Sequence, residues 1–314
     1  MNMSMFQVTD FNLQHTLECG QAFRWKRDGD GYLGVVPRLA SPFDSTQGCP
    51  ERSRRTLARD SARCQEFTAR SVGSSVWYVS QDGDTLFVET DPPVPPEEIV
   101  RYFSLDLNLQ EIFSPLRKDP VLEPALKEFW GLRILRQDPW ECLGSYIFSS
   151  FNNVKRITSL VENLSIRFGN RVGSNGTLRY TFPTAERLAP LSPRDLYPIR
   201  PGFRDKYLLE TAKQVAEGKC DLKKLDAMET AEAKEALLAL PGVGEKVAEC
   251  ILLFAYGKKD AFPIDVWVER ALRRFYFRNR RRTLRNMQRF ARRRFGKAAG
   301  YAQEYLYAYA REYL

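Results

Sequence analysis

The stretch that decides the fold of this chain reads Leu240-Pro241-Gly242-Val243-Gly244-Glu245-Lys246-Val247-Ala248-Glu249-Cys250. Apolar residues recur at helical spacing on both sides of its turn, at positions 233, 236, 237 and 240 before it and at 247, 250, 251 and 254 after it. The proline ends the first helix, and the two glycines permit backbone conformations that other residues resist. The pattern predicts a helix–hairpin–helix over residues 231–256.

The hairpin is also a predicted anion site. Backbone amides of the turn and the N-terminus of the second helix suit a DNA phosphate, so we expect Gly242, Gly244 and Val247 to bind DNA. Lys246 stands in the first turn of that helix, where the helix dipole disfavours a charged ammonium group. A neutral amine there is a nucleophile that forms Schiff bases with carbonyl carbons. A solvated lysine that binds phosphate is the alternative, and the spacing leaves both open.

The charge of the chain points to a polyanionic partner. Its 314 residues carry a formal net charge of +9, and residues 270–297 contain thirteen Lys and Arg with no Asp or Glu. Such a cluster is typical of a polyanion-binding surface. No apolar run is long enough for a transmembrane helix and no signal peptide is visible. We therefore expect a cytoplasmic protein of bacterial type, associated with the nucleoid and not with a membrane.

The cysteines and the histidine argue against several kinds of site. Six cysteines are scattered without a CxxC pair, which fits neither a disulfide framework nor a zinc or iron–sulfur site. The one histidine, His15, is interpreted as structural or surface-exposed. We expect reduced, mostly structural thiols, and neither a redox cofactor nor a catalytic metal.

Residues 1–115 have the pattern of a small antiparallel α+β domain. Strands are predicted at 22–26 and 32–36, a hairpin at 76–79 and 85–88, and a helix at 97–103. Residues 39–75 are rich in Ser, Arg, Thr, Gly and Pro, have no sustained period, and separate segments that would otherwise be neighbouring strands. They are interpreted as a mobile insertion.

Residues 116–314 are predicted to form an all-helical domain. A helical segment is expected at 119–132, and Asp138 and Pro139 open the next helix in N-cap and N1 positions. Further helices are expected at 154–168, after 183 and 192, at 203–218 and at 265–277, followed by basic helices to the C-terminus.

Asp265 follows the loop beyond the hairpin. One interpretation is an N-cap for the following helix. The other is an ionised carboxylate that opposes positive charge developing on a sugar in an oxocarbenium-like transition state. A capping aspartate is rigidly held, so the two interpretations are compatible.

Six motifs, in the same order, resemble those of the 8-oxoguanine DNA glycosylase family, a branch of the helix–hairpin–helix-GPD superfamily. They lie at residues 19–25, 136–143, 149–156, 202–204, 240–250 and 299–303, and together span most of the chain. The resemblance implies a TBP-like antiparallel sheet domain followed by a helical glycosylase domain. It also implies a monomeric, bifunctional DNA glycosylase and AP lyase that excises 8-oxoguanine from duplex DNA.

The resemblance implies a role for each matched residue. Lys246 would attack the sugar C1′, displace the base and leave a Schiff base, from which β-elimination nicks the strand. Asp265 would be its electrostatic partner. The orphan cytosine and the gap left by the flipped base would be contacted by four residues, Arg156, Arg204, Asn152 and Asn153. Phosphate binding by the arginines and a turn role for Asn153 are the alternatives.

Four further residues would form the pocket for the flipped base. Gly20 would accept a hydrogen bond from the protonated N7, which guanine lacks. Cys250 and Tyr307 would sandwich the ring, and Gln303 would bind its pairing edge. Each also has a structural alternative, since Cys250 lies on an apolar helical stripe and Tyr307 on an aromatic helix.

The chain departs from the family pattern at two positions near the predicted site. Phe151 replaces the first Asn of a triple-Asn turn, which puts selectivity for the opposite base in doubt and makes Phe151 a candidate intercalating wedge. Trp267 replaces a histidine just past Asp265. Two other functions stay open from the sequence: a monofunctional glycosylase for alkylated bases and a noncatalytic DNA-binding protein.

Overall fold

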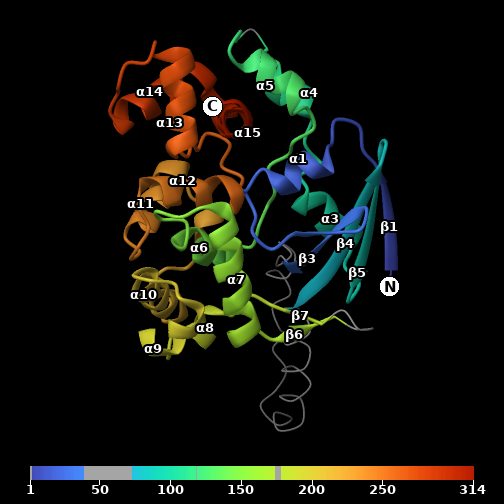
Figure 1. Cartoon of the computed structure of the whole chain (residues 1–314), viewed down its shortest axis with the longest axis vertical. Coiled ribbons are helices and arrows are strands. Elements are labelled where there is room, and N and C mark those ends of the chain that lie inside the picture. Colours follow the sequence, from blue (N-terminus) through green and yellow to red (C-terminus); the bar gives the residue numbers. More distant parts are fainter. Residues whose placement is uncertain (1, 39–72, 118, 174–177) are drawn as a thin grey trace, which may run out of the picture.

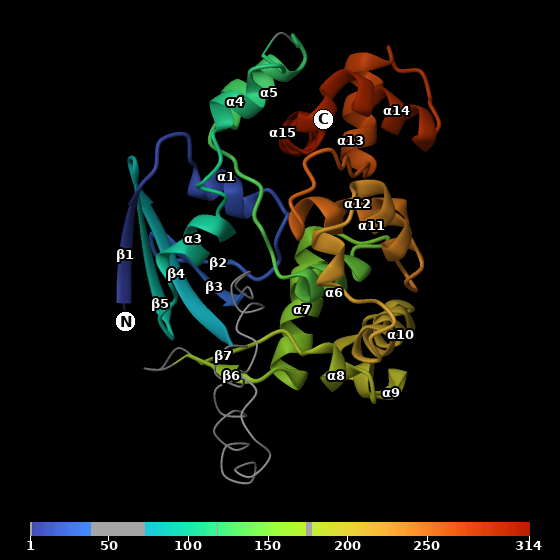
Figure 2. The same cartoon turned by 180° about the vertical axis from the view of Figure 1, so that it is seen from behind.

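The computed structural model describes residues 2–38, 73–117, 119–173 and 178–314 (Figure 1). Its N-terminal part is a five-stranded antiparallel sheet in the order β1-β5-β4-β3-β2. The strands are β1 (Asn2–Gln7), β2 (Lys26–Asp28), β3 (Gly31–Pro37), β4 (Ser74–Asp82) and β5 (Thr85–Asp91). Helices α1 (Leu13–Glu18) and α3 (Pro96–Tyr102) cover the face of the sheet that is turned toward the helical part (Figure 2).

This arrangement confirms the predicted antiparallel α+β class but corrects two strands. Residues 22–25 do not pair in the sheet, because Arg24 and Trp25 send their side chains to partners far away in the sequence; β2 begins only at Lys26. The strand β1, which pairs along β5, was not predicted from the sequence. Most of the predicted insertion, residues 39–72, lies outside the described residues, and Ser74 and Ser75 belong to β4.

The helical part contains one large apolar core. Its helices are α4 (Leu109–Phe113), α5 (Leu122–Glu128), α6 (Pro139–Ile147), α7 (Val154–Phe168), α8 (Ala185–Leu188), α9 (Pro193–Leu196), α10 (Arg204–Ala216), α11 (Thr230–Leu238), α12 (Glu245–Phe254), α13 (Val266–Ala271), α14 (Leu284–Phe295) and α15 (Ala299–Tyr313). A short hairpin, β6 (Arg171–Val172) and β7 (Arg179–Tyr180), was not predicted. No helix in the described part of the chain is long and apolar enough to cross a membrane.

Local capping fixes several helix starts where the sequence placed them. Asp138 accepts a hydrogen bond from the Glu141 amide at 2.8 Å and so caps α6, while Asn153 accepts one from the Arg156 amide at 2.9 Å and caps α7. The predicted helix at 119–132 is shorter than expected, because α5 covers only Leu122–Glu128. The helix predicted at 265–277 is α-helical only to Ala271 and continues as a π-helical turn, Leu272–Tyr276.

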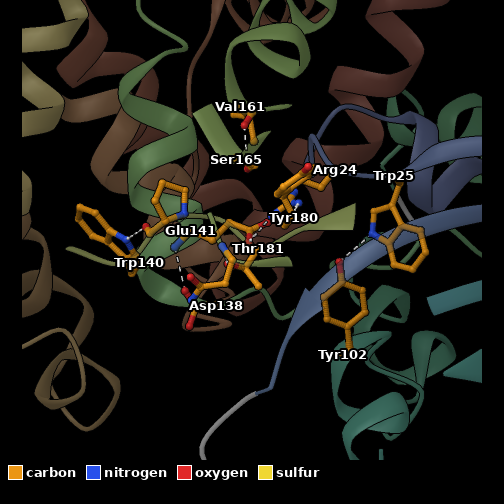
Figure 3. A network of polar contacts seen from close by, with 12 residues as sticks. Arg24, Trp25, Tyr102, Asp138, Trp140, Glu141, Val161, Ser165, Tyr180 and Thr181 are labelled. Carbon is orange, nitrogen blue, oxygen red and sulfur yellow. Dashed lines mark hydrogen bonds and ion pairs between the residues drawn. The ribbon is translucent and has the colours of Figure 1, made fainter. Parts of the chain in front are cut away.

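A buried polar network joins the sheet to the helical part (Figure 3). The Arg24 guanidinium lies 3.5 Å from the Glu141 carboxylate and also donates to the Tyr180 carbonyl. Burial raises the pKa of Glu141 to about 7, while Arg24 opposes that rise. The neighbouring Trp25 donates through Nε1 to the Tyr102 hydroxyl at 2.8 Å. These bonds hold the segment that precedes β2 between α3, α6 and β7.

A second buried pair ties the hairpin to the loop that carries Asp265. Lys234 Nζ of α11 lies 2.8 Å from Glu249 Oε1 of α12, and Glu249 Oε2 accepts a hydrogen bond from the Phe262 amide at 2.8 Å. Lys234 Nζ also contacts Glu245 at 2.5 Å, but that carboxylate is largely exposed. Glu249 therefore ties α12 both to α11 and to the loop before Asp265.

We expect Lys234→Met to destabilise the fold by about 3 kcal/mol, because it leaves the Glu249 carboxylate buried without its cation. Urea unfolding at pH 7 measures the loss. Lys224→Met is the matched control, since that lysine is exposed and its ion pair with Asp221 is 3.8 Å long. If Lys234→Met lost no more stability than Lys224→Met, the buried Glu249 carboxylate would not need the Lys234 ammonium group to compensate its charge.

Candidate active site

A cavity of about 930 Å³ opens between the two parts of the molecule. Its walls come from the end of α1, the turn at 149–153 between α6 and α7, the start of α12, the segment around Asp265, and α15. Most of the predicted site residues line it, namely Gly20, Asn152, Asn153, Gly244, Lys246, Val247, Cys250, Asp265, Gln303 and Tyr307. Arg156, Arg204 and Gly242 are not among the lining residues.

Lys246 is the second residue of α12, and its amine lies at the wall of the cavity. Nζ lies 3.2 Å from Ser149 Oγ and 4.9 Å from the centre of the Tyr146 ring. None of the ion pairs formed by the described residues involves Lys246. The amine is therefore held by a neutral hydroxyl and an aromatic face, which leaves it available to a reacting carbon.

Asp265 confirms the capping interpretation. It has extended backbone angles, and its Oδ1 accepts a hydrogen bond from the Val268 amide at 2.8 Å at the start of α13. Burial raises the pKa of Asp265, while the Val268 amide and the charge on Lys246 oppose that rise. The cap fixes a carboxyl group in the same cavity as the lysine amine.

Cys250 of α12 and Tyr307 of α15 both line the cavity. Cys250 is buried one turn after Lys246, and burial raises the pKa of its thiol to about 12, so the sulfur is neutral at physiological pH. The Tyr307 ring carries the Arg311 guanidinium 5.6 Å from its centre. An apolar thiol and an aromatic face are suitable walls for a flat ring.

Gly20 is conformationally constrained where it meets the cavity. Its φ is +97°, and a Cβ built on it would lie 3.2 Å from Val154 Cγ2. The carbonyls on either side are occupied, since Cys19 O accepts from Arg311 at 2.8 Å and Gln21 O accepts from Gln137 at 2.8 Å. Within the described ranges, no group donates a hydrogen bond to the Gly20 carbonyl.

Of the two arginines predicted to contact the orphan cytosine, Arg204 holds the 149–153 turn. Arg204 donates from Nε to the Ser150 carbonyl at 2.9 Å and from Nη2 to the Phe151 carbonyl at 3.0 Å. Arg156 donates to the Arg200 carbonyl at 2.9 Å. Phe151 has φ +49° and is 98% exposed. The turn thus presents a bare aromatic ring at the rim of the cavity.

The hairpin has the backbone that its glycines predict. Gly242 has φ +77°, and a Cβ there would lie 2.6 Å from Tyr207 Cβ. Gly244 caps α12 in an extended conformation, with open space where its Cβ would lie. No neighbouring group therefore crowds Gly244 at the N-terminus of α12, the end of a helix that suits a phosphate.

The sequence analysis assigned no role to Ser149 or Glu304, which both line the cavity. Ser149 is the hydrogen-bond partner of Lys246, and only the fold shows it. Glu304 could have been noticed in the sequence, because a charged residue is unusual among the buried residues of a helix. It lies beside Tyr301, Tyr305 and Ala308 on the buried side of α15. Among the described residues, no cluster of three or more His, Cys, Asp or Glu side chains has the arrangement of a metal site.

Two family models cover nearly the whole chain. The first is described as the N-terminal domain of 8-oxoguanine DNA glycosylase and matches residues 4–143. The second is described as the HhH-GPD superfamily of base excision DNA repair proteins and matches residues 145–297.

Curated relatives and solved structures agree with these models. A probable N-glycosylase/DNA lyase of Methanothermobacter thermautotrophicus is 34% identical over 68% of this chain and 74% of its own length. The N-glycosylase/DNA lyase OGG1 of Arabidopsis thaliana is 31% identical over 83% of this chain and 65% of its own length. The crystal structure of Clostridium acetobutylicum 8-oxoguanine glycosylase/lyase, in complex with DNA containing cytosine opposite 8-oxoguanine, is 30% identical. It covers 99% of this chain and 98% of its own, with a TM-score of 0.81. The chain therefore belongs to the HhH-GPD superfamily of base excision DNA repair proteins, in the branch that carries the 8-oxoguanine DNA glycosylase N-terminal domain.

Proposed function

We propose that this protein is a bifunctional DNA glycosylase and AP lyase that excises 8-oxoguanine from duplex DNA. The observation that carries the proposal is the placement of Lys246 and Asp265 in one cavity. The lysine amine has no carboxylate partner among the described residues, and the aspartate is fixed by its cap. A lysine nucleophile beside a fixed carboxylate is the arrangement needed to replace a glycosidic bond by a Schiff base.

In the first step, the Lys246 amine, once its ammonium proton has been removed, forms a bond to the sugar C1′ while the bond from C1′ to the base nitrogen breaks. The base leaves with the bonding pair and takes up a proton, and the amine loses one. Asp265 opposes the positive charge that develops on the sugar in the transition state. The sugar ring then opens to a Schiff base. Loss of a proton from C2′ and departure of the 3′ phosphate oxygen complete β-elimination and nick the strand.

Base recognition is proposed for the residues around the same cavity. Cys250 and Tyr307 would stack on the two faces of the flipped base, and Gln303 would bind its pairing edge. The unoccupied Gly20 carbonyl would accept the N7 hydrogen of 8-oxoguanine. Guanine places an unprotonated N7 at that point, so the two acceptors would face each other without a hydrogen.

DNA binding is proposed to surround this pocket. Asn152 and Asn153 line the cavity beside Phe151, Arg204 holds the turn through the Ser150 carbonyl, and Arg156 donates to the Arg200 carbonyl. Gly242, Gly244 and Val247 would hold a phosphate at the start of α12. The basic residues of 270–297 would add affinity for any sequence.

The test is base release and strand nicking on duplexes that carry 8-oxoguanine opposite each of the four bases. Borohydride added during the reaction should trap a covalent complex between the intact protein and the DNA. Base release without a trapped complex would indicate a monofunctional glycosylase. Binding without base release would indicate a noncatalytic DNA-binding protein.

Selectivity for the opposite base is expected to change in Phe151→Asn. An exposed phenylalanine offers the orphan base only a stacking surface, whereas an asparagine amide offers hydrogen bonds. One good base contact changes discrimination roughly tenfold. We expect the variant to prefer cytosine over the other opposite bases by about that factor more than the wild-type protein does, in single-turnover excision. Stability should not fall, because asparagine tolerates the positive φ at this position. An unchanged preference would show that Phe151 does not face the orphan base.

A further inference from the structure

Two successive residues of α15 line the cavity, and each carries a buried oxygen atom without a hydrogen-bond partner. Gln303 and Glu304 are 4% and 1% exposed, and both line the cavity wall. The Oε1 atom of each is buried and accepts no hydrogen bond from the described residues. A buried acceptor without a donor is costly, so a pair of them in one pocket indicates a ligand that supplies donors.

Glu304 is surrounded by groups that influence its charge but leave Oε1 free. The carboxyl group faces Cys19 from the end of α1, Lys246 from α12, Asp265 from the start of α13, and Arg311 from its own helix. Lys246 is bonded instead to Ser149, Arg311 donates to the Cys19 carbonyl, and the Cys19 thiol donates to the Thr16 carbonyl at 3.3 Å. The Cys19 thiol also interacts with the Glu304 carboxyl group, but Oε1 has no hydrogen-bond partner among the described residues.

Partial protonation of Glu304 lowers the cost of leaving its Oε1 atom without a donor. Burial raises the pKa of this carboxyl group to about 7. The Cys19 thiol and the charges on Arg311 and Lys246 oppose that rise, and the charge on Asp265 adds to it. At pH 7 the carboxyl group is therefore about half neutral, and the neutral form costs less to leave unpaired than a carboxylate. Hydrogen-bond donors of a bound ligand would then favour the ionised form of Glu304, because a carboxylate is a stronger acceptor than a neutral carboxyl group.

The chemistry of the acceptors selects the ligand class. Gly20 O, Gln303 Oε1 and Glu304 Oε1 are three free acceptors on one cavity. A flipped 8-oxoguanine carries N–H groups at N1, N2 and N7, whereas pyrimidines and adenine carry fewer. The excess of acceptors on the protein therefore matches the excess of donors on an oxidised guanine.

We propose that Glu304 is a base-recognition residue, whose Oε1 accepts a hydrogen bond from an N–H group of the flipped purine beside the contact made by Gln303. This inference rests on the proposed function, because it takes the cavity as the pocket for the excised base. It assigns to Glu304 a part in base release that strand cleavage at a site already lacking its base does not need.

The test compares two reactions of the full-length protein. Single-turnover excision of 8-oxoguanine opposite cytosine requires the base contact, whereas cleavage at a preformed abasic site does not. In Glu304→Met, excision should fall roughly ten- to a hundredfold more than abasic-site cleavage, as expected when one buried donor on the base loses its acceptor. Glu304→Gln keeps an acceptor oxygen and should restore excision to within about fivefold of wild type. Glu312→Gln, an exposed position on the same helix, is the matched control.

Other outcomes overturn the proposal. An equal fall in both reactions would mean that Glu304 acts through Lys246 or through the fold, and wild-type excision in Glu304→Met would mean that it makes no base contact. Glu304→Ala serves in its place if thermal unfolding shows that the methionine variant does not fold. A wild-type protein that does not excise 8-oxoguanine would overturn the proposed function itself, whatever the variants do.

Discussion

We expect Lys246→Gln to abolish both base excision and strand nicking. Glutamine has no nucleophilic amine, so neither attack on C1′ nor a Schiff base is possible. Single-turnover excision of 8-oxoguanine should fall at least about a thousandfold, the scale expected when covalent catalysis is lost. Borohydride should trap no complex between the variant and DNA.

Binding of damaged DNA should survive the same substitution. The glutamine amide can keep the hydrogen bond to Ser149, and the hairpin amides that are proposed to bind phosphate do not change. We expect the Kd for an 8-oxoguanine duplex to stay within about threefold of wild type, which is a small change in binding free energy. Lys213→Gln, an exposed position on α10, controls for the loss of one positive charge.

Two results would contradict the assignment of Lys246. Turnover equal to wild type would reject the lysine mechanism. Base release that persists without nicking would mean that water attacks the sugar, and that the amine serves only the lyase step or none.

The hairpin was predictable because all of its determinants are local. The apolar spacing around residues 240–250, the proline and the two glycines lie within one short segment, and the observed α11 and α12 follow them closely. The same is true of α7, which begins and ends where its Asn153 cap and Gly169 indicate. Asp265 was predicted as a cap for the same reason, and the Val268 amide confirms it.

The errors arose where distant residues decide the structure. Residues 22–25 have the composition of a strand, but Arg24 is drawn to Glu141 and Tyr180, and Trp25 to Tyr102. The strand β1 pairs with β5, which lies about eighty residues later in the sequence. The residues of β1 carry no turn signal that would predict this pairing. Sheet pairing and domain contacts of this range have no local signature.

The cavity shows the same division. Lys246 and Asp265 are found from a motif and a resemblance, which name residues but not neighbours. Ser149 and Glu304 become visible only when the turn at 149–153, α12 and α15 converge. The roles of these residues in the reaction stay predictions, which substitutions of Lys246, Asp265 and Glu304 test one residue at a time.

Asp265→Asn separates the two roles of this residue, because asparagine is as good an N-cap as aspartate but carries no charge. We expect stability to stay within about 0.5 kcal/mol of wild type, since the hydrogen bond to the Val268 amide is kept. Excision should fall by roughly a hundred- to a thousandfold, as for the loss of other groups that stabilise transition-state charge. Asp265→Ala should lose the same activity and about 1 kcal/mol of stability as well.

The matched control is Asp138→Asn, because Asp138 caps α6 through a hydrogen bond of the same length, 2.8 Å, but does not line the cavity. Excision by that variant should stay within about threefold of wild type, so that a loss confined to Asp265 reports charge rather than capping.

The pH profile gives an independent readout. Burial raises the pKa of Asp265, so protonation should begin to cost the wild-type protein activity at a higher pH than for an exposed aspartate. That contribution disappears in Asp265→Asn. An Asp265→Asn protein that excises 8-oxoguanine at the wild-type rate would show that the carboxyl group is a helix cap and no more.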